Sequence, residues 1–231
     1  MKPLEITDPK PRDFGWVLKP VASARHTIQR CDRGHYEITI RHSILRGIDL
    51  AMLQWWFSSF FGLSITMGGE RYPAYQVWHP LDHVAAVKIG GSKGSLVREG
   101  DTIRIHEYFQ RRRAFEVNTE AYVFYGREDG FGILVRRGRL PVMRLFHRFE
   151  AVEGGVACHT KMIVGLEGGI LRHPVNRWLL PREFGEEKMR AWCRHNVEEV
   201  GCLENFLAQA YARRHQGTGI TLSLPPPPAS E

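Results

Sequence analysis

The chain has 231 residues, of which 43% are hydrophobic and 25% are charged, so it can bury the core of one ordinary domain. Its net charge of +7 comes with short basic clusters that lack a helix-turn-helix, RNP or zinc-finger pattern, and we expect no nucleic-acid partner. No stretch approaches the roughly 18 consecutive apolar residues of a membrane span, so no membrane partner is expected either.

The N-terminal segment is rich in proline and lacks the hydrophobic core of a signal peptide. It predicts an extended arm, residues 1–25, that packs over the domain or stays mobile. The four cysteines are scattered, without a paired motif or a disulfide-like framework. Both features favour a cytoplasmic protein with reduced thiols.

The hydrophobic pattern then predicts a strand, a helical region, many strands and one long helix, in that order. Residues 35–45 predict the first strand, and residues 47–61, rich in Leu, Trp and Phe, predict a helix or helix pair. Residues 186–214 contain no proline and predict the long helix. The remaining strands are predicted at residues 76–78, 83–89, 102–110, 121–125, 132–136, 142–149 and 156–164.

This order of elements indicates an α+β fold in which a curved antiparallel sheet wraps around the long C-terminal helix. Such a fold leaves a cavity between sheet and helix, which is a favoured place for a small-molecule site. It resembles the helix-grip arrangement of the Bet v 1 and lipid-transfer group. We assign it to one domain, residues 26–216, and expect the Pro-rich tail at residues 217–231 to be disordered.

Two charged side chains lie on the apolar face of the predicted long helix. Trp192, Leu203 and Phe206 mark that face at helical spacing. His195 and Glu199 fall between them, one turn apart, and therefore project side by side. A carboxylate turned toward the core is strongly unfavourable without a cationic partner, and a metal ion is the most economical one.

The predicted sheet supplies further candidate ligands. Glu107 has the strand parity of Ile103 and Ile105, so it is either an inward-facing ligand or a hydrogen-bonded core residue. The segment WHPLDH precedes the next strand, and its proline predicts a bend in the backbone. Its two histidines, His79 and His83, are candidate ligands or else surface and capping residues.

Together, His79, Glu107, His195 and Glu199 make a set of two imidazoles and two carboxylates. This donor set suits zinc and, less selectively, iron, manganese or cobalt. It contains no thiolate, which argues against a structural zinc site and favours a catalytic ion with room for water or substrate. His83 stays open as the alternative to His79.

Other polar residues are candidates for roles beside the metal. His147 lies on a predicted strand and is either a general acid or base facing the cavity or a satisfied core histidine. Asp82 is a second candidate for proton transfer. Tyr72 and Tyr75 lie near the expected mouth of the cavity and are candidates for substrate binding.

Four motifs, WHPLDH, IHEYF, LFHRFE and RHNVEEVG, follow one another along the chain. Their order over residues 72–210 resembles the 2,4-diacetylphloroglucinol hydrolase family, which includes phloretin hydrolase. The resemblance implies a Bet v 1-like domain that hydrolyses an aryl–acyl carbon–carbon bond with zinc held by two His and two Glu. Carried over by motif, these ligands are His79, Glu107, His195 and Glu199.

The resemblance also implies roles for the other candidates. Asp82 matches the amide or acidic side chain that the family has three residues after its first ligand, and His147 matches a strand histidine. Tyr72 or Tyr75 matches one of the tyrosines that hold the phenolic substrate. No counterpart of a further family tyrosine follows His147, where Met162 stands.

The expected reaction is metal-assisted hydrolysis of a ketone attached to a phenolic ring. Zinc makes hydroxide available for attack on the acyl carbonyl, and the ring carbon leaves after tautomerisation of the phenol, with His147 or Asp82 moving the proton. Two other classes stay open: a non-catalytic carrier of a hydrophobic ligand, and a metal-independent polyketide cyclase or aromatase. The partner is a small phenolic ketone in the first case, and a homo-oligomer is compatible with all three.

Overall fold

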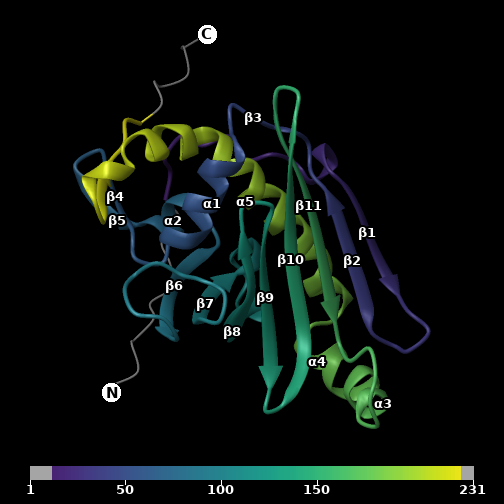
Figure 1. The fold of residues 1–231 in the computed structure, drawn as a ribbon. Helices are drawn as coiled ribbons and strands as arrows, with labels where there is room; N and C mark the ends of the chain where they lie inside the picture. The colour runs from purple at the N-terminus through teal and green to yellow at the C-terminus, as the bar shows by residue number, and fades with distance from the viewer. Residues whose placement is uncertain (1–11, 225–231) are drawn as a thin grey trace.

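The computed structural model describes residues 12–224, and these residues form a long antiparallel sheet (Figure 1). Its strands follow the order β1-β2-β11-β10-β9-β8-β7-β6, with β3 paired to β11. The strands are β1 (Arg25–Arg30), β2 (Tyr36–Arg41), β3 (Leu45–Arg46), β6 (His83–Gly90), β7 (Thr102–Tyr108), β8 (Glu116–Arg127), β9 (Gly130–Arg137), β10 (Leu140–Val152) and β11 (Gly155–Val164).

One long helix, α5 (Glu186–Ala212), lies against the sheet (Figure 1). Sixteen of its 27 residues are buried, so it is a core helix rather than a surface one. Its first turn carries two acidic residues, Glu186 and Glu187, whose negative charges interact favourably with the positive end of the helix dipole. A curved antiparallel sheet that grips one C-terminal helix is the helix-grip, Bet v 1-like α+β fold, and the fold prediction is confirmed.

A second, smaller sheet with two helices lies beside one end of α5 (Figure 1). It contains β4 (Ser64–Met67), β5 (Glu70–Pro73) and β12 (Gly219–Thr221), and the helices are α1 (Leu50–Ser59) and α2 (Ala74–Trp78). The first of these helices begins after Asp49, whose carboxylate accepts a hydrogen bond from the N–H of Met52 at 2.8 Å. Aromatic residues of both helices join the main core.

The described part of the C-terminal tail is packed, which corrects the expectation of disorder over residues 217–231. Strand β12 pairs in parallel with β4, Ile220 facing Ile65. Ile220 and Leu222 are 1% and 3% exposed. Strand β12 was missed in the sequence because only a few apolar residues precede the prolines. Residues 225–231 lie outside the described part.

The N-terminal arm also packs over the domain along its described residues. Phe14 is 5% exposed and belongs to the main core, and the ring of Trp16 stacks on Phe206 of α5 at 5.9 Å. A short helical turn, η1 (Val21–Ser23), leads into β1. Residues 1–11 of the predicted arm lie outside the described part.

Several predicted elements differ from the observed ones. Residues 76–78 belong to helix α2 rather than to a strand, because Tyr75, Val77 and Trp78 are buried on a helical turn that follows Pro73. Strand β1 was missed because its side chains are mostly exposed and do not alternate. Short helical segments also occur between β7 and β8, before α5 and after it: η2 (Phe109–Arg111), η3 (Arg113–Phe115), α3 (Arg172–Pro174), η4 (Val175–Leu179), α4 (Leu180–Glu183) and η5 (Arg214–Gln216).

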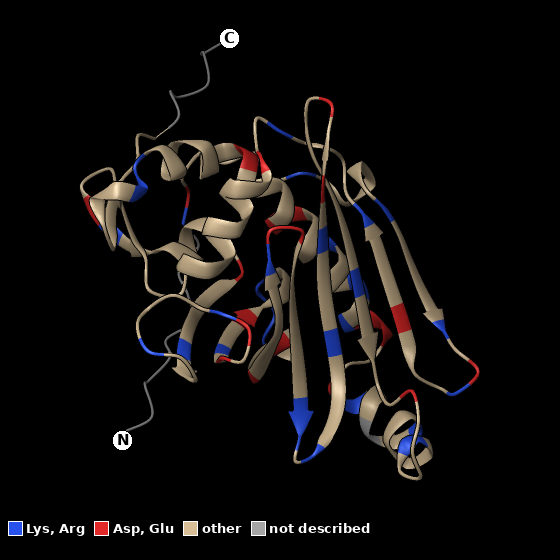
Figure 2. Cartoon of the chain, in the orientation of Figure 1, with Lys and Arg blue, Asp and Glu red and all other residues tan. Residues whose placement is uncertain are grey.

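Charged residues are distributed over strands, loops and helices in the view of Figure 2, rather than gathered in one patch. Among the described residues, no helix combines the length and apolar character needed to cross a membrane. The four cysteines are free, and three of them, Cys158, Cys193 and Cys202, are buried.

Candidate metal centre

Four candidate ligands meet where the β6–β7 end of the sheet approaches α5. His83 is the first residue of β6, and Glu107 lies directly opposite it on β7 in the antiparallel register. His195 and Glu199 lie one turn apart on α5, which contacts the η2 turn that follows β7. Sheet and helix thus contribute one imidazole and one carboxylate each.

The four side chains converge through one atom each. Nε2 of His83 lies 3.7 Å from Oε2 of Glu107 and 3.4 Å from Oε2 of Glu199. Nε2 of His195 lies 3.5 Å from Oε2 of Glu107 and 3.8 Å from Oε2 of Glu199. Each imidazole nitrogen therefore faces both carboxylate oxygens across one small space.

The spacing and the state of these atoms fit a divalent transition metal. Both Nε2 atoms are buried and have no hydrogen-bond partner within the described residues. Zinc lies about 2.0–2.1 Å from nitrogen and oxygen ligands, so ligands at the corners of a tetrahedron are about 3.3–3.4 Å apart. The observed separations of 3.4–3.8 Å are close to that value.

Hydrogen bonds at the other ring nitrogen fix the orientation of both imidazoles. Nδ1 of His83 is 2.8 Å from the carbonyl oxygen of Tyr75, and Nδ1 of His195 is 2.9 Å from Oδ2 of Asp82. Since both acceptors are oxygens without a proton to give, each Nδ1 carries the hydrogen. In the neutral ring, Nε2 then keeps its lone pair toward the centre, as metal-binding histidines do.

The two carboxylates are oriented in the same manner. The hydroxyl of Tyr75 donates to Oε2 of Glu107 at 2.7 Å, and Nδ2 of Asn196 donates to Oε1 of Glu199 at 2.6 Å. The indole N–H of Trp78 donates to the backbone carbonyl of Glu199 at 2.7 Å and ties α2 to α5. Each of the four candidate ligands is therefore held by a hydrogen bond to a residue outside the set.

Electrostatics favour a cation at this point. Burial by itself lowers the pKa of His195, but its hydrogen bond to Asp82 and the negative charges of Glu107 and Glu199 together raise that pKa well above its usual value. Burial lowers the pKa of His83, and the neighbouring imidazoles lower it further. Positive charge is thus favoured between the two glutamates, and a divalent cation supplies more of it than one proton does.

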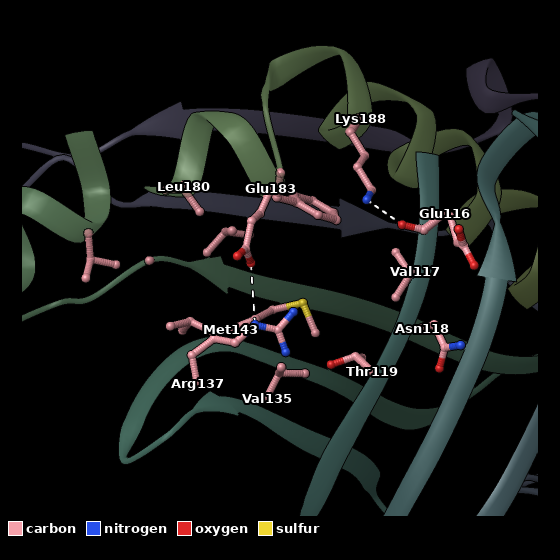
Figure 3. A pocket seen from close by; sticks show the side chains of 15 residues that line it. Glu116, Val117, Asn118, Thr119, Val135, Arg137, Met143, Leu180, Glu183 and Lys188 are labelled. Atoms are coloured by element: carbon pink, nitrogen blue, oxygen red, sulfur yellow. Dashed lines mark hydrogen bonds and ion pairs between the residues drawn. The ribbon is translucent and has the colours of Figure 1, made fainter. Parts of the chain in front are cut away.

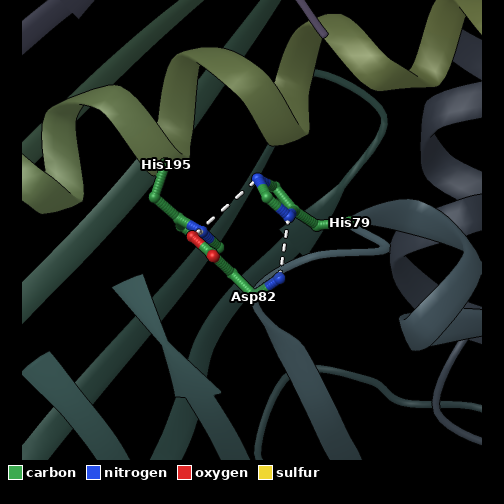
Figure 4. Close-up of side chains that lie close together, drawn as sticks. All are labelled: His79, Asp82 and His195. Atoms are coloured by element: carbon green, nitrogen blue, oxygen red, sulfur yellow. Dashed lines mark hydrogen bonds and ion pairs between the residues drawn. The ribbon is translucent and has the colours of Figure 1, made fainter. Parts of the chain in front are cut away.

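His79, the histidine carried over from the sequence as a ligand, lies beside this set rather than in it. Its Nδ1 accepts a hydrogen bond from the N–H of Asp82 at 3.2 Å, and its Nε2 is 3.3 Å from Oε2 of Glu198. His79, Asp82 and His195 also form a compact group (Figure 4), but hydrogen bonds within the group account for its geometry. The geometry therefore favours His83 as the fourth ligand.

Asp82 is a buried carboxylate held by the backbone as well as by His195. The N–H groups of Gln110 and Arg111 donate to its two oxygens at 3.0 and 3.2 Å. Both donors have positive φ, 53° and 57°, a conformation uncommon outside glycine. Burial opposes ionisation, but the bond to His195 and these contacts outweigh it and lower the pKa of Asp82 to about 2. Asp82 therefore suits positioning of His195 better than proton transfer.

His147 shares a small cavity with the candidate ligands. This inner cavity, of about 80 Å³, is lined by Glu107, Glu199 and His147 together with aromatic side chains, among them Phe57, Phe60, Tyr75, Trp78 and Phe131. Nδ1 of His147 is 2.8 Å from Oγ1 of Thr160. Burial lowers the pKa of His147 to about 4, so the ring is neutral at pH 7.

The two tyrosines predicted to bind substrate have different positions. Tyr75 lines the inner cavity, but its hydroxyl already donates to Glu107 and its ring stacks on His83 at 3.7 Å. Tyr72 does not line that cavity; its hydroxyl donates to Glu70 and its ring packs edge-on against Phe14. The structure therefore brings Tyr75 to the site and leaves Tyr72 outside it.

Two residues of the site were missed in the sequence. Asn196 precedes Glu199 by three residues, a spacing at which helical side chains meet, so it could have been found as the partner of that carboxylate. Trp78 was visible only as part of the WHPLDH segment. Its bond to the Glu199 carbonyl depends on how α2 packs on α5, which no local pattern indicates.

Comparisons with known proteins give similarity of structure only. No protein-family model matches the sequence, and no curated protein gives a significant match. A protein from Nitrosomonas europaea, NE0264, is 12% identical with a TM-score of 0.45, over 76% of this chain and 96% of its own. A STAR-related lipid transfer protein from Xanthomonas axonopodis is 13% identical with a TM-score of 0.41, over 79% and 98%.

A major latex-like protein from Panax ginseng is also similar, at 8% identity and a TM-score of 0.42, over 70% of this chain and 97% of its own. At such values the similarity says nothing about the site. The helix-grip assignment rests on the strand order and on the burial of α5.

Proposed function

We propose that this protein is a zinc-dependent hydrolase that cleaves the carbon–carbon bond between an acyl group and a phenolic ring. The observation that carries the proposal is the convergence, at 3.4–3.8 Å, of two carboxylate oxygens with two buried imidazole nitrogens that have no hydrogen-bond partner among the described residues. The order of the four sequence motifs supports the reaction type, because it resembles the 2,4-diacetylphloroglucinol hydrolase family.

In this proposal, His83, Glu107, His195 and Glu199 hold the ion. Zinc, when bound, supplies a Lewis acid toward water and a carbonyl oxygen. Asp82, Tyr75 and Asn196 hold the ligands in place through the hydrogen bonds described above. The apolar surroundings exclude bulk water, which strengthens electrostatic effects on the reacting carbonyl.

His147 is the proposed proton carrier. Hydrolysis adds the oxygen of water to the acyl carbon, breaks the bond to the ring carbon and leaves a proton on that carbon. A neutral imidazole accepts a proton from water, and because burial lowers the pKa of His147 to about 4, it gives that proton up readily to the ring carbon. Its position among the lining residues of the inner cavity supports this role.

A carrier of an apolar ligand is the second candidate, and the observation that favours it is the apolar lining of the cavities between sheet and helix. A carrier gains nothing from two glutamates and two histidines converging on one point, since their burial is costly. A metal-independent cyclase would use His147 but would leave the unpartnered Nε2 atoms unexplained.

The test combines elemental analysis with an assay of acylphloroglucinol hydrolysis. We expect about one zinc ion per chain, release of carboxylic acid and deacylated phenol, and loss of activity on chelation that is restored by zinc. Protein purified without metal that binds apolar ligands and hydrolyses nothing supports the carrier. Activity that survives chelation supports the cyclase-like alternative.

A further inference from the structure

A larger cavity lies next to the inner one. This outer cavity, of about 430 Å³, is bounded by β8, β9 and β10 on the sheet side and by α4 and the first turn of α5 on the other (Figure 3). Its apolar lining includes Val135, Val142, Val164, Val175 and Leu180. Polar and charged residues also line this cavity, but no residue of the proposed hydrolytic reaction belongs to it.

The two cavities adjoin through shared walls. Val117, Thr119, Met143 and Phe184 line both of them. Met143 and Phe184 belong to opposite sides of the boundary, since one lies on β10 and the other lies between α4 and α5. A ligand that passes between these side chains occupies both spaces at once.

The inner cavity is too small to hold a whole substrate. Sites for small molecules usually enclose about 300–1,000 Å³, whereas the inner cavity encloses about 80 Å³. It accommodates the reacting part of a ligand beside Glu107, Glu199 and His147. The rest of the ligand has to extend outward, and the outer cavity is the adjoining space.

The charges around the outer cavity already have partners. Nε of Arg137 is 3.5 Å from Oε2 of Glu183, and Nζ of Lys188 donates to the backbone carbonyl of Glu116 at 2.6 Å (Figure 3). Arg137 and Glu183 therefore compensate each other's charge, and the ammonium of Lys188 is held by a neutral carbonyl and lies 5.6 Å from the centre of the Phe184 ring. Apolar side chains dominate the wall between them, so the space suits an uncharged, apolar group.

We infer that the ligand of this site has two parts: a phenolic ketone that reacts in the inner cavity and an apolar tail of several carbons on the acyl side that fills the outer cavity. This inference rests on the proposed function for the identity of the reacting part. The inference of a tail requires only that one ligand occupy the two cavities together. Substrates with a short acyl group, such as acetyl, then use only part of the available binding surface.

The experiment measures binding of 2,4,6-trihydroxyphenyl alkyl ketones with acyl chains of two to ten carbons, by calorimetry on zinc-loaded and on metal-free protein. Each methylene buried in an apolar space strengthens binding about fourfold. We expect affinity to rise by about this factor per methylene until the outer cavity is full. An affinity that stays flat from acetyl to decanoyl overturns the inference.

The second part of the experiment uses substitutions that fill the outer cavity. Val142→Trp and Val175→Trp place a large side chain at half-buried positions that line the outer cavity and not the inner one. We expect each to abolish the gain with chain length while the acetyl ketone binds as before. Val87→Trp makes the same change at a position that is 44% exposed on β6 and serves as control.

The outcomes separate this inference from the proposed hydrolysis. A rise in affinity with chain length that is lost in the two cavity-filling variants supports the apolar tail. If no ketone is hydrolysed in that case, only the proposed hydrolysis is contradicted. Hydrolysis that is equally fast for all chain lengths, with flat binding, supports the reaction and overturns the tail. The inference of an apolar tail is also overturned if affinity rises with chain length as steeply in both cavity-filling variants as in the unaltered protein.

Discussion

At the scale of single residues, the decisive atoms are Nε2 of His83 and Nε2 of His195. A buried polar atom without a partner destabilises the folded state by about 1–3 kcal/mol. Both atoms are buried and unpartnered within the described residues, and they face the same two carboxylates. In the proposed metal-bound form a single ion between them satisfies all four groups at once, so we expect the metal-free protein to be the less stable form.

The choice between two histidines can be tested directly. His83→Ala removes a ligand and is expected to lower metal affinity at least tenfold. His79→Ala removes an equally buried imidazole, at 0% exposure, and is expected to reduce stability while metal content stays near one ion per chain. The measurement is elemental analysis with a melting curve for each variant. Equal loss of metal in both variants contradicts the ligand set proposed here.

Glu107 separates the enzyme from the carrier. Glu107→Gln keeps the shape of the side chain but weakens its bond to a metal, so we expect metal content to fall and hydrolysis of an acylated polyphenol to drop by orders of magnitude. Glu120→Gln is the matched control, because Glu120 lies on the neighbouring strand β8 and its side chain is 56% exposed. Full metal and full activity in Glu107→Gln remove this residue from the site.

His147 makes stability depend on pH. Its pKa is about 4 in the folded protein, because of burial, and about 6.5 when the chain is unfolded. Between these values the unfolded chain binds a proton that the folded protein does not, so stability falls as the pH decreases from 6.5 toward 4, by roughly 2–3 kcal/mol at pH 4.5. We expect His147→Phe, in metal-free protein, to show a smaller loss between pH 7 and pH 4.5 by urea unfolding. His26→Phe, at an exposed position of β1, leaves the loss unchanged.

At the scale of elements, the sequence predicted those whose side chains alternate or repeat strongly. The strands from β6 to β11 and helix α5 have such patterns, and most were found with errors of up to three residues at their ends, whereas only residues 121–125 of β8 were predicted. Strand β1 is mostly exposed and the small sheet of β4, β5 and β12 has very short strands. Their formation depends on tertiary pairing, which a local pattern does not contain.

The last strand is an element whose role can be measured. Ile220 of β12 is 1% exposed, so Ile220→Ala is expected to destabilise the fold by about 2–4 kcal/mol. Thr221→Ala, at the neighbouring exposed position, should change stability by about 0.5 kcal/mol or less. Thermal unfolding of the two variants checks this. Unchanged stability in Ile220→Ala means that the strand is dispensable, as the sequence alone suggested.

At the scale of the whole molecule, the sequence predicted three of the four converging residues. Glu107 followed from strand parity, and His195 and Glu199 followed from their position on the apolar face of α5. The choice of His83 over His79 did not follow, because it depends on the bend after Pro80 and on which imidazole keeps a free Nε2. For the same reason, Asp82 was predicted to transfer a proton, whereas in the structure it holds the ring of His195 by a hydrogen bond.

Removal of metal should affect the whole fold. A ligand that binds only the folded protein stabilises it by about 4 kcal/mol when present at a thousand times its dissociation constant. We expect chelation of the zinc-loaded protein to lower the melting temperature, and added zinc to restore it, with release of protons on binding. In His195→Ala, chelation should shift the melting temperature little. A shift as large as in the unaltered protein shows that the stabilising ion binds elsewhere.

The arrangement of the four converging residues along the chain has a consequence for biosynthesis. His83 and Glu107 leave the ribosome long before His195 and Glu199, which lie near the C-terminus. Contacts between residues so distant in sequence form late and slowly. Of the four converging residues the nascent sheet therefore presents only His83 and Glu107, and we expect the proposed ion to be captured when α5 docks, as a late step in folding rather than as its nucleus.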